Sequence, residues 1–181
     1  HKIIEAENYT VSKFGSYQKL EIFPEYLKYF LKHNHLDKPL KVVVDCGNGS
    51  AGVFAPQLLR DLGCEVIELY TDPDATFPNH VPDPEYIFVM RDLGKRVVKE
   101  KADLGIALDA DGDRFGAVDE QGSFIYADRM LLLLAKDVLS RNPGKKILYD
   151  VKCTRLIESL VPTFGGIPMI HITGHAPIKQ T

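Results

Sequence analysis

Residues 41–69 read KVVVDCGNGSAGVFAPQLLRDLGCEVIEL, and this stretch predicts a strand, a helix and a second strand in succession. The valine run that ends at Asp45 is typical of a buried strand, and the second strand is expected over 64–69. A helix is expected between them, from about 53 to 62, with Gly63 closing it. A strand–helix–strand unit implies parallel strands and a right-handed crossover, so the chain is expected to have an α/β fold.

The same pattern returns about 105 residues later. Residues 145–150 form a predicted strand that again ends in an aspartate, Asp150, and a helix over about 155–160 and a strand over 167–172 follow. We therefore expect a three-layer α/β architecture with a mixed or parallel sheet and helices on both faces. The βαβ unit is repeated in a second, incomplete domain.

The chain is expected to divide into three segments. An N-terminal tail and connecting helix take up 1–38, an α/β domain takes up 39–140, and the incomplete start of a second, similar domain takes up 141–181. The sequence begins at His1 rather than Met and stops at Thr181, shortly after a polar motif, so we expect a piece of a longer protein.

Helical spacing of apolar residues predicts three further helices. The first runs from Tyr17 to about Asn34, with Pro24 as a candidate break, and another runs from Ala127 to Ser140. A third is expected over 86–100. Its expected inward-facing residues are Phe88, Met90 or Arg91, Leu93, Val97 and Val98.

The most informative polar segment is DADGDR, residues 109–114, which lies between two apolar runs that read as strands. Three carboxylates at alternate positions repel one another, and this repulsion is costly unless a cation lies among them. Hard oxygen ligands suit Mg²⁺ or Ca²⁺, so Asp109, Asp111 and Asp113 are candidate metal ligands. The planar guanidinium of Arg114 could bind a phosphate or carboxylate beside the metal.

A calcium-binding EF-hand loop is an alternative for the same segment, because Glu120 lies at the twelfth position from Asp109. The sixth position of such a loop requires glycine, but here it is Arg114, and the flanking segments read as strands rather than helices. These two features favour a strand-end metal loop over an EF-hand.

Composition limits the classes of function. The formal net charge of −3 gives no electrostatic case for nucleic-acid binding. No apolar run approaches the ~20 residues that a membrane span requires. The three cysteines have no metal-binding spacing and are expected to be reduced thiols of a cytoplasmic protein.

Two further features leave alternatives open. Gly47-x-Gly49-x-x-Gly52 matches the dinucleotide-binding pattern, with Glu65 or Glu68 near the place of a ribose-binding acid, although any tight strand-to-helix turn favours glycine. Residues 71–85 form a proline-rich loop in which Asn79 and His80 either point toward the metal loop or only brace their own loop.

Five motifs, in order along the chain, carry a family resemblance. They are VDCGNG at 44–49, FPNHVPDP at 77–84, ADLGIALDADGDR at 102–114, VKCT at 151–154 and TGH at 173–175. Together they resemble the α-D-phosphohexomutase superfamily, of the phosphomannomutase and phosphoglucomutase type. The resemblance also accounts for the Gly47 loop as a tight turn of this family, without a nucleotide.

The resemblance implies a Mg²⁺-dependent enzyme that interconverts hexose 1-phosphates and 6-phosphates through a phosphoserine and a bisphosphate intermediate. Asp109, Asp111 and Asp113 would hold Mg²⁺, with the phosphoserine as the fourth protein ligand. Arg114, Lys152 and His175 would act in catalysis. The same three residues, with Thr173 and Gly174, would contact the phosphosugar.

The family's phosphoserine loop, sugar-recognition loop and C-terminal phosphate clamp have no counterpart among the 181 residues. The resemblance therefore implies that the chain supplies the metal-binding second domain and the start of the third. It would depend on the missing domains of the same protein and would be inactive alone. The preference for mannose or glucose depends on the missing sugar loop.

Overall fold

The structure, a computed structural model, describes residues 15–179 and separates into two units, His1–His35 and Leu36–Thr181. Most of the expected tail over 1–15 lies outside the described residues. In the first unit, helix α2 (Phe23–His33) is shorter than the helix expected from Tyr17. Pro24 does not break this helix but lies in its first turn, where a missing N–H costs no hydrogen bond.

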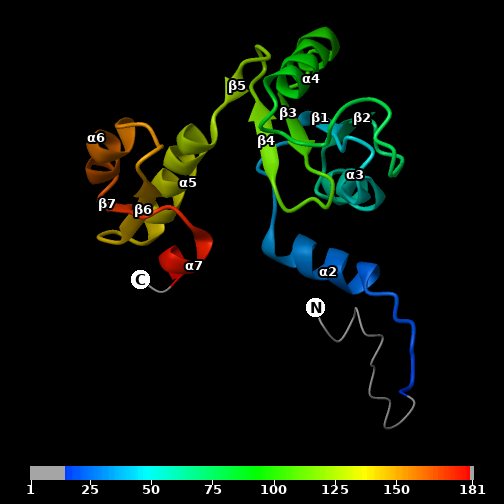
Figure 1. Cartoon of the computed structure of the whole chain (residues 1–181), viewed down its shortest axis with the longest axis horizontal. Coiled ribbons are helices and arrows are strands. Elements are labelled where there is room, and N and C mark those ends of the chain that lie inside the picture. The colour runs from blue at the N-terminus through cyan, green and yellow to red at the C-terminus, as the bar shows by residue number, and fades with distance from the viewer. Residues whose placement is uncertain (1–14, 180–181) are drawn as a thin grey trace, which may run out of the picture. The chain divides into compact units, whose positions relative to one another are not determined.

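The second unit contains a mixed five-stranded sheet in the order β2-β1-β3-β4-β5 (Figure 1). The parallel strands are β1 (Lys41–Asp45), β2 (Glu65–Leu69) and β3 (Leu104–Leu108). The antiparallel strands are β4 (Phe115–Val118) and β5 (Phe124–Ile125). The expected βαβ unit at 41–69 is therefore present, with the parallel pairing that it requires.

Helices cover both faces of this sheet. Successive side chains of β1 point to opposite faces, so neighbouring residues of this strand contact different helices. Val43 packs with α4 (Ile87–Glu100) on one face. Val44 packs on the other face with the 3₁₀ turn η1 (Ser50–Val53) and helix α3 (Ala55–Asp61). The helix expected over about 53–62 corresponds to α3, which begins two residues later and follows a 3₁₀ turn.

The expected inward face of α4 is partly wrong. Its buried residues are Val89, Met90, Leu93, Gly94 and Val97. Phe88 and Val98 were expected to face inward, but they are 67% and 52% exposed. Met90, Leu93, Gly94 and Val97 lie on one stripe of the helix. The buried stripe therefore includes a glycine, whereas the larger apolar residues Phe88 and Val98 lie outside it.

A separate two-stranded parallel sheet consists of β6 (Lys146–Asp150) and β7 (Ile167–His171). A core of its own joins β6 to α5 (Ala127–Arg141) and α6 (Leu156–Thr163). The short helix α7 (His175–Lys179) follows β7. The expected α/β class, with a mixed sheet and a repeated strand–helix–strand unit, is confirmed.

Two details of the region that contains β6 and β7 differ from the sequence-based expectation. Helix α6 extends to Thr163 and includes Pro162, so it is longer than the helix expected over 155–160. Helix α5 shares its core with β6 and α6, although the expected division places it in the preceding domain. The division itself, at 140–141, stays a prediction.

Within residues 15–179, no helix has both the length and the apolar character needed to cross a bilayer.

A close contact between two glycines fixes α4 against the turn between β4 and β5. A Cβ atom added at Gly94 would lie 2.4 Å from the carbonyl oxygen of Gly122, and one added at Gly122 would lie 2.7 Å from the carbonyl oxygen of Gly94. Both neighbours are backbone atoms, which cannot rotate away. The helix can therefore approach this turn only where neither residue has a side chain.

We predict that Gly94→Ala destabilises the protein. Alanine in place of a helical glycine ordinarily stabilises a helix by about 0.5–1 kcal/mol, but here the added methyl group collides with the Gly122 backbone. We expect the free energy of unfolding in urea to fall by about 1–3 kcal/mol, as in other overpacked sites. Lys99→Ala, at an exposed position of the same helix, is the control and should stay within about 0.5 kcal/mol of the wild type. A more stable Gly94→Ala variant would contradict the prediction.

Candidate functional site

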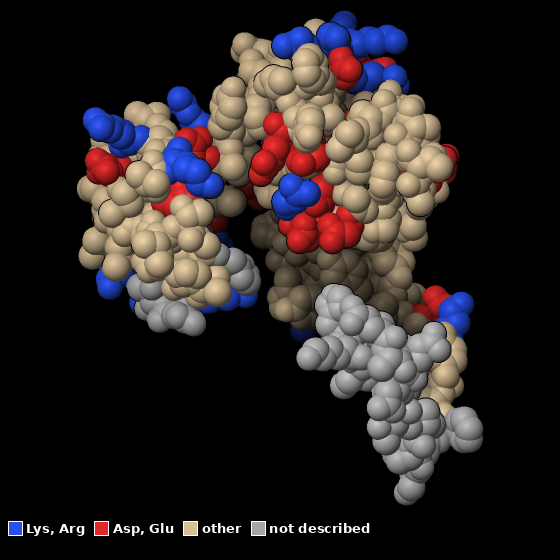
Figure 2. Space-filling view, in the orientation of Figure 1, with Lys and Arg blue, Asp and Glu red and all other residues tan. Residues whose placement is uncertain are grey.

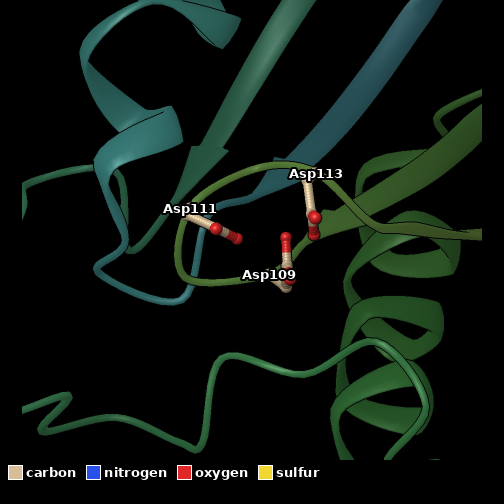
Figure 3. Close-up of side chains that lie close together, drawn as sticks. All are labelled: Asp109, Asp111 and Asp113. Carbon is tan, nitrogen blue, oxygen red and sulfur yellow. The ribbon is translucent and has the colours of Figure 1, made fainter. Parts of the chain in front are cut away.

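The three aspartates lie on the turn that joins β3 to β4, where Leu108 pairs with Phe115. Each offers a carboxylate oxygen, and these oxygens all lie within 4.8 Å of one another. Figure 3 shows the side chains of Asp109, Asp111 and Asp113 pointing toward a common region inside the turn. The flanking elements are strands and not helices, so the EF-hand alternative is wrong.

Asp109 is 2% exposed, and Arg114 satisfies its buried carboxylate. The backbone N–H of Arg114 donates to Oδ1 at 3.0 Å, and the side-chain Nε–H donates to Oδ2 at 2.8 Å. Burial alone would raise the pKa of Asp109, but these hydrogen bonds and the guanidinium charge outweigh it and hold the pKa below its usual value. Asp109 is therefore an ionised, fixed member of the cluster.

The other two carboxylates of the cluster are exposed. The negative charge of Asp111, with a hydrogen bond to Asp109 and the charge of that residue, raises the pKa of Asp113. The raised pKa shows that three negative charges at this turn are mutually unfavourable. A divalent cation among them would remove this repulsion, and carboxylate oxygens are the donors that Mg²⁺ and Ca²⁺ prefer.

Arg114 is also held from the proline-rich loop. Its Nη1 donates to Oδ1 of Asp83 at 3.4 Å, while half of its side chain stays exposed. On the face that Figure 2 shows, acidic side chains gather around a basic one. Asp83 was not among the predicted site residues, although its position between two prolines, Pro82 and Pro84, restricts the backbone on both sides of it.

The loop over 71–85 braces itself against the turn after β1. His80 lies with Nε2 3.1 Å from both carboxylate oxygens of Asp45, which is 3% exposed, and with Nδ1 2.8 Å from the carbonyl oxygen of Val81. Asn79 donates from Nδ2 to Oδ1 of Asn48 at 2.7 Å. These contacts favour the bracing role that the sequence left open for Asn79 and His80.

The glycine pattern is explained by backbone packing. A Cβ atom at Gly49 would lie 2.6 Å from the carbonyl oxygen of Ala110, and one at Gly52 would lie 1.8 Å from that of Thr71. The N–H of Ser50, at the start of η1, donates to the oxygen of Ala110 at 2.9 Å. Gly49 is therefore packed directly on the aspartate turn and Gly52 on the segment after β2, and these two contacts require glycine whether or not a nucleotide binds.

The two acids considered for a ribose are engaged elsewhere. Glu65 forms an ion pair with Lys41 at 3.1 Å, and Glu68 pairs with Arg60 and accepts a hydrogen bond from Thr71. These contacts lie along the edge strand β2 and its neighbours, and they give both acids a structural explanation.

The remaining predicted site residues follow the ends of β6 and β7. Lys152 comes two residues after the end of β6, and Thr173 comes two residues after the end of β7. Gly174 has a φ of +135°, and His175 is the first residue of α7. The structure thus brings Lys152 and Thr173–His175 to the same end of one small sheet, while their roles stay predictions.

Comparison with known proteins gives one family. The domain described as "Phosphoglucomutase/phosphomannomutase, alpha/beta/alpha domain II" matches residues 24–122. A phosphomannomutase/phosphoglucomutase of Pseudomonas aeruginosa is 51% identical over 174 residues, which are 96% of this chain and 38% of that protein. A phosphoglucomutase of Neisseria meningitidis is 43% identical over 179 residues, which are 98% of this chain and 39% of that protein.

Solved structures give the same result. The crystal structure of a phosphoglucomutase/phosphomannomutase family protein from Burkholderia thailandensis has a TM-score of 0.90 and 45% identity. The match covers 99% of this chain and 39% of that one. A putative phosphomannomutase of Thermus thermophilus, at 20% identity and a TM-score of 0.71, shares the fold. The chain spans somewhat more than a third of the length of the relatives that it matches.

We predict a pH-dependent contribution of His80 to stability. Both ring nitrogens of His80 face acceptor oxygens, so the protonated ring satisfies both, and the hydrogen bond to Asp45 raises its pKa. Because the folded-state pKa exceeds the unfolded value of about 6.5, the stabilisation is fully present below about pH 6.5 and is lost as the pH rises through the folded-state pKa.

The measurement is the free energy of unfolding of the wild type and of His80→Gln from pH 5.5 to pH 9. The difference should be about 1.5 kcal/mol at the acid end, as for other hydrogen bonds to charged groups, and should shrink as the pH rises. His33→Gln, in the other unit of the chain, is the control for histidine loss in general. A difference that is constant or grows with pH would contradict the charged pair.

Proposed function

This chain belongs to the phosphoglucomutase/phosphomannomutase family of the α-D-phosphohexomutase superfamily, and we propose that it contributes the Mg²⁺ loop and part of the substrate cleft of a phosphohexomutase. The proposed reaction interconverts hexose 1-phosphates and 6-phosphates through a phosphoserine and a bisphosphate intermediate. One observation carries the proposal: three carboxylates converge beside a fixed arginine inside the region that matches the family.

The donor set fits Mg²⁺. Asp109, Asp111 and Asp113 offer three hard oxygen ligands from one turn, a number that leaves room for water or phosphate oxygens in the metal's coordination shell. When bound, the ion would supply positive charge that offsets the charge of a transferring phosphoryl group. By family resemblance, a phosphoserine from the missing part of the protein would be the fourth protein ligand.

Arg114 is proposed to bind the same phosphoryl group. Its Nε–H donates to Asp109 and its Nη1 donates to Asp83, so two of the five guanidinium N–H donors orient the side chain. The others remain for phosphate oxygens. A guanidinium fixed in advance stabilises developing negative charge without having to reorganise during the reaction.

Lys152, Thr173, Gly174 and His175 are proposed to contact the phosphosugar, with Lys152 and His175 also acting in catalysis. Their common place at the carboxyl ends of β6 and β7 supports this proposal, because ligand sites of parallel α/β sheets lie outside these ends. A lysine there binds a phosphate oxygen as a point charge, and a histidine can take the proton of an attacking sugar hydroxyl.

We predict that the chain binds Mg²⁺ weakly through the aspartate turn, because Mg²⁺ relies on phosphate oxygens to complete its shell. Asp111→Asn should weaken binding by about tenfold, since one ligand charge close to the ion is removed. Titration followed by ¹⁵N NMR of the turn amides measures the affinity. Asp92→Asn, on an exposed position of α4, is the control. Unchanged binding in both Asp109→Asn and Asp111→Asn would show that the metal assignment is wrong.

We also predict that this chain alone does not interconvert hexose phosphates, even with Mg²⁺ and a hexose bisphosphate activator. Phosphoryl transfer requires donor, acceptor and stabilising charges in one arrangement, and no serine of the chain has the family's phosphoserine context. A coupled mutase assay on the purified chain, with and without the missing domains added in trans, tests the expectation. Turnover by the chain alone that Asp111→Ala abolishes would reveal a nucleophile within these residues.

A further inference from the structure

Asp150, the last residue of β6, links two segments that follow neighbouring strands. Its Oδ1 accepts a hydrogen bond from the backbone N–H of Lys152 at 2.9 Å. Its Oδ2 accepts one from the hydroxyl of Thr173 at 3.0 Å, and the ammonium of Lys152 lies 3.6 Å from the same oxygen. One carboxylate therefore holds both the Lys152 turn and the segment that begins at Thr173.

The carboxylate is suited to this linking role. The side chain of Asp150 is 17% exposed, whereas that of Lys152 is 74% exposed, so the acid is held inside and the ammonium reaches outward. The backbone hydrogen bond from Lys152 is the largest of the effects that hold the pKa of Asp150 below its usual value. Asp150 is thus an acceptor at neutral pH and can receive both donors at once.

The first βαβ unit contains the same arrangement. Asp45 ends β1, and its Oδ1 accepts a hydrogen bond from the backbone N–H of Gly47 at 2.9 Å. Its second oxygen lies 3.1 Å from Nε2 of His80, in the loop that follows β2. In both units, a strand-terminal aspartate binds the N–H two residues ahead and a side chain from beyond the adjacent parallel strand.

The register of the two strand pairs is also the same. Asp45 lies opposite Leu69, the last residue of β2, and Asp150 lies opposite His171, the last residue of β7. Because the geometry recurs, the contacts of Asp150 follow from the fold and are not an accident of one side-chain rotamer. The two copies differ two residues after the aspartate, where the first has glycine and the second has Lys152.

We propose that Asp150 is a positioning residue, which sets Lys152 and the segment Thr173–Gly174 in one arrangement for a hexose phosphate. This inference rests on the proposed function. Asp150 acts through its neighbours, because a carboxylate would repel a phosphate and the ammonium of Lys152 extends from it toward solvent. A site is precise only when its contacting side chains are themselves held by hydrogen bonds, and Asp150 supplies them here.

The test is ¹⁵N NMR titration of the chain with glucose 1,6-bisphosphate, followed at the amides of Lys152 and Gly174. In the wild type, both amides should shift with a single dissociation constant. Asp150→Ala should weaken binding by about tenfold or more, as when residues supporting a ligand are lost, and the two amides should then titrate separately. Asp150→Asn keeps an oxygen acceptor for the N–H of Lys152 and an amide that can pair with the Thr173 hydroxyl, so its affinity should stay within about threefold.

A control variant and a second test variant separate positioning from general stability. Asp137→Asn removes an exposed carboxylate on α5 that pairs with Arg141, and it should leave the titration unchanged. Thr173→Val removes the hydroxyl donor to Asp150 together with any contact of that hydroxyl with the ligand, so its readout is the separate titration of the two amides and not the affinity. This variant keeps the proposal testable if Asp150→Ala does not fold. Urea unfolding of each variant reports any loss of global stability.

The outcomes are distinguishable. A single dissociation constant at both amides in Asp150→Ala and in Thr173→Val would overturn the positioning role while leaving the proposed function intact. Equal losses in Asp150→Asn and Asp150→Ala would assign the effect to charge, and that result also overturns positioning. If the wild type shows no response at Lys152 or Gly174, the assignment of this strand end to the phosphosugar fails, and the inference fails with it.

Discussion

Buried carboxylates at the ends of buried strands are the constraint on which the rest of this structure depends. Asp45 and Asp109 are 3% and 2% exposed, and a buried polar side chain is tolerated only when hydrogen-bond partners surround it. Each one therefore attracts a donor from another segment: His80 from the proline-rich loop, and Arg114 from across the metal turn. These hydrogen bonds hold the loops of the candidate site in their conformations.

The same constraint connects the metal turn to the rest of the sheet edge. The glycine loop after β1 approaches the metal turn closely enough for Ser50 N–H to bind the oxygen of Ala110. The proline-rich loop reaches it from another direction, through Asp83 and Arg114. Two segments distant in sequence thus support the three aspartates, so the aspartate turn is held by its neighbours and is not an isolated acidic turn.

Much of this could be read from the sequence because the signals are local. Alternating aspartates between apolar runs identified the turn at 109–114, and the valine run at 42–44 identified a buried strand. Pairs joined over long distances in the chain, such as Asp83 with Arg114, leave no periodic signal, so the sequence analysis missed them. The exposure of Phe88 was missed for a related reason, since only the packed structure shows that glycine and not a large residue completes the buried stripe of α4.

Asp45 at the end of β1 and Asp150 at the end of β6 occupy equivalent positions, but the residues that follow them are constrained differently. In both units, the aspartate binds the main chain of the residue two positions on, so the arrangement does not specify a side chain there. At Gly47, φ is +51° and Pro82 stands 2.8 Å from where a Cβ would lie, which keeps that position without a side chain. The corresponding position in the second strand–helix–strand unit is Lys152, whose side chain is largely exposed. The same backbone geometry thus occurs twice, and packing excludes a side chain two positions after Asp45 but leaves room for a long, exposed one two positions after Asp150.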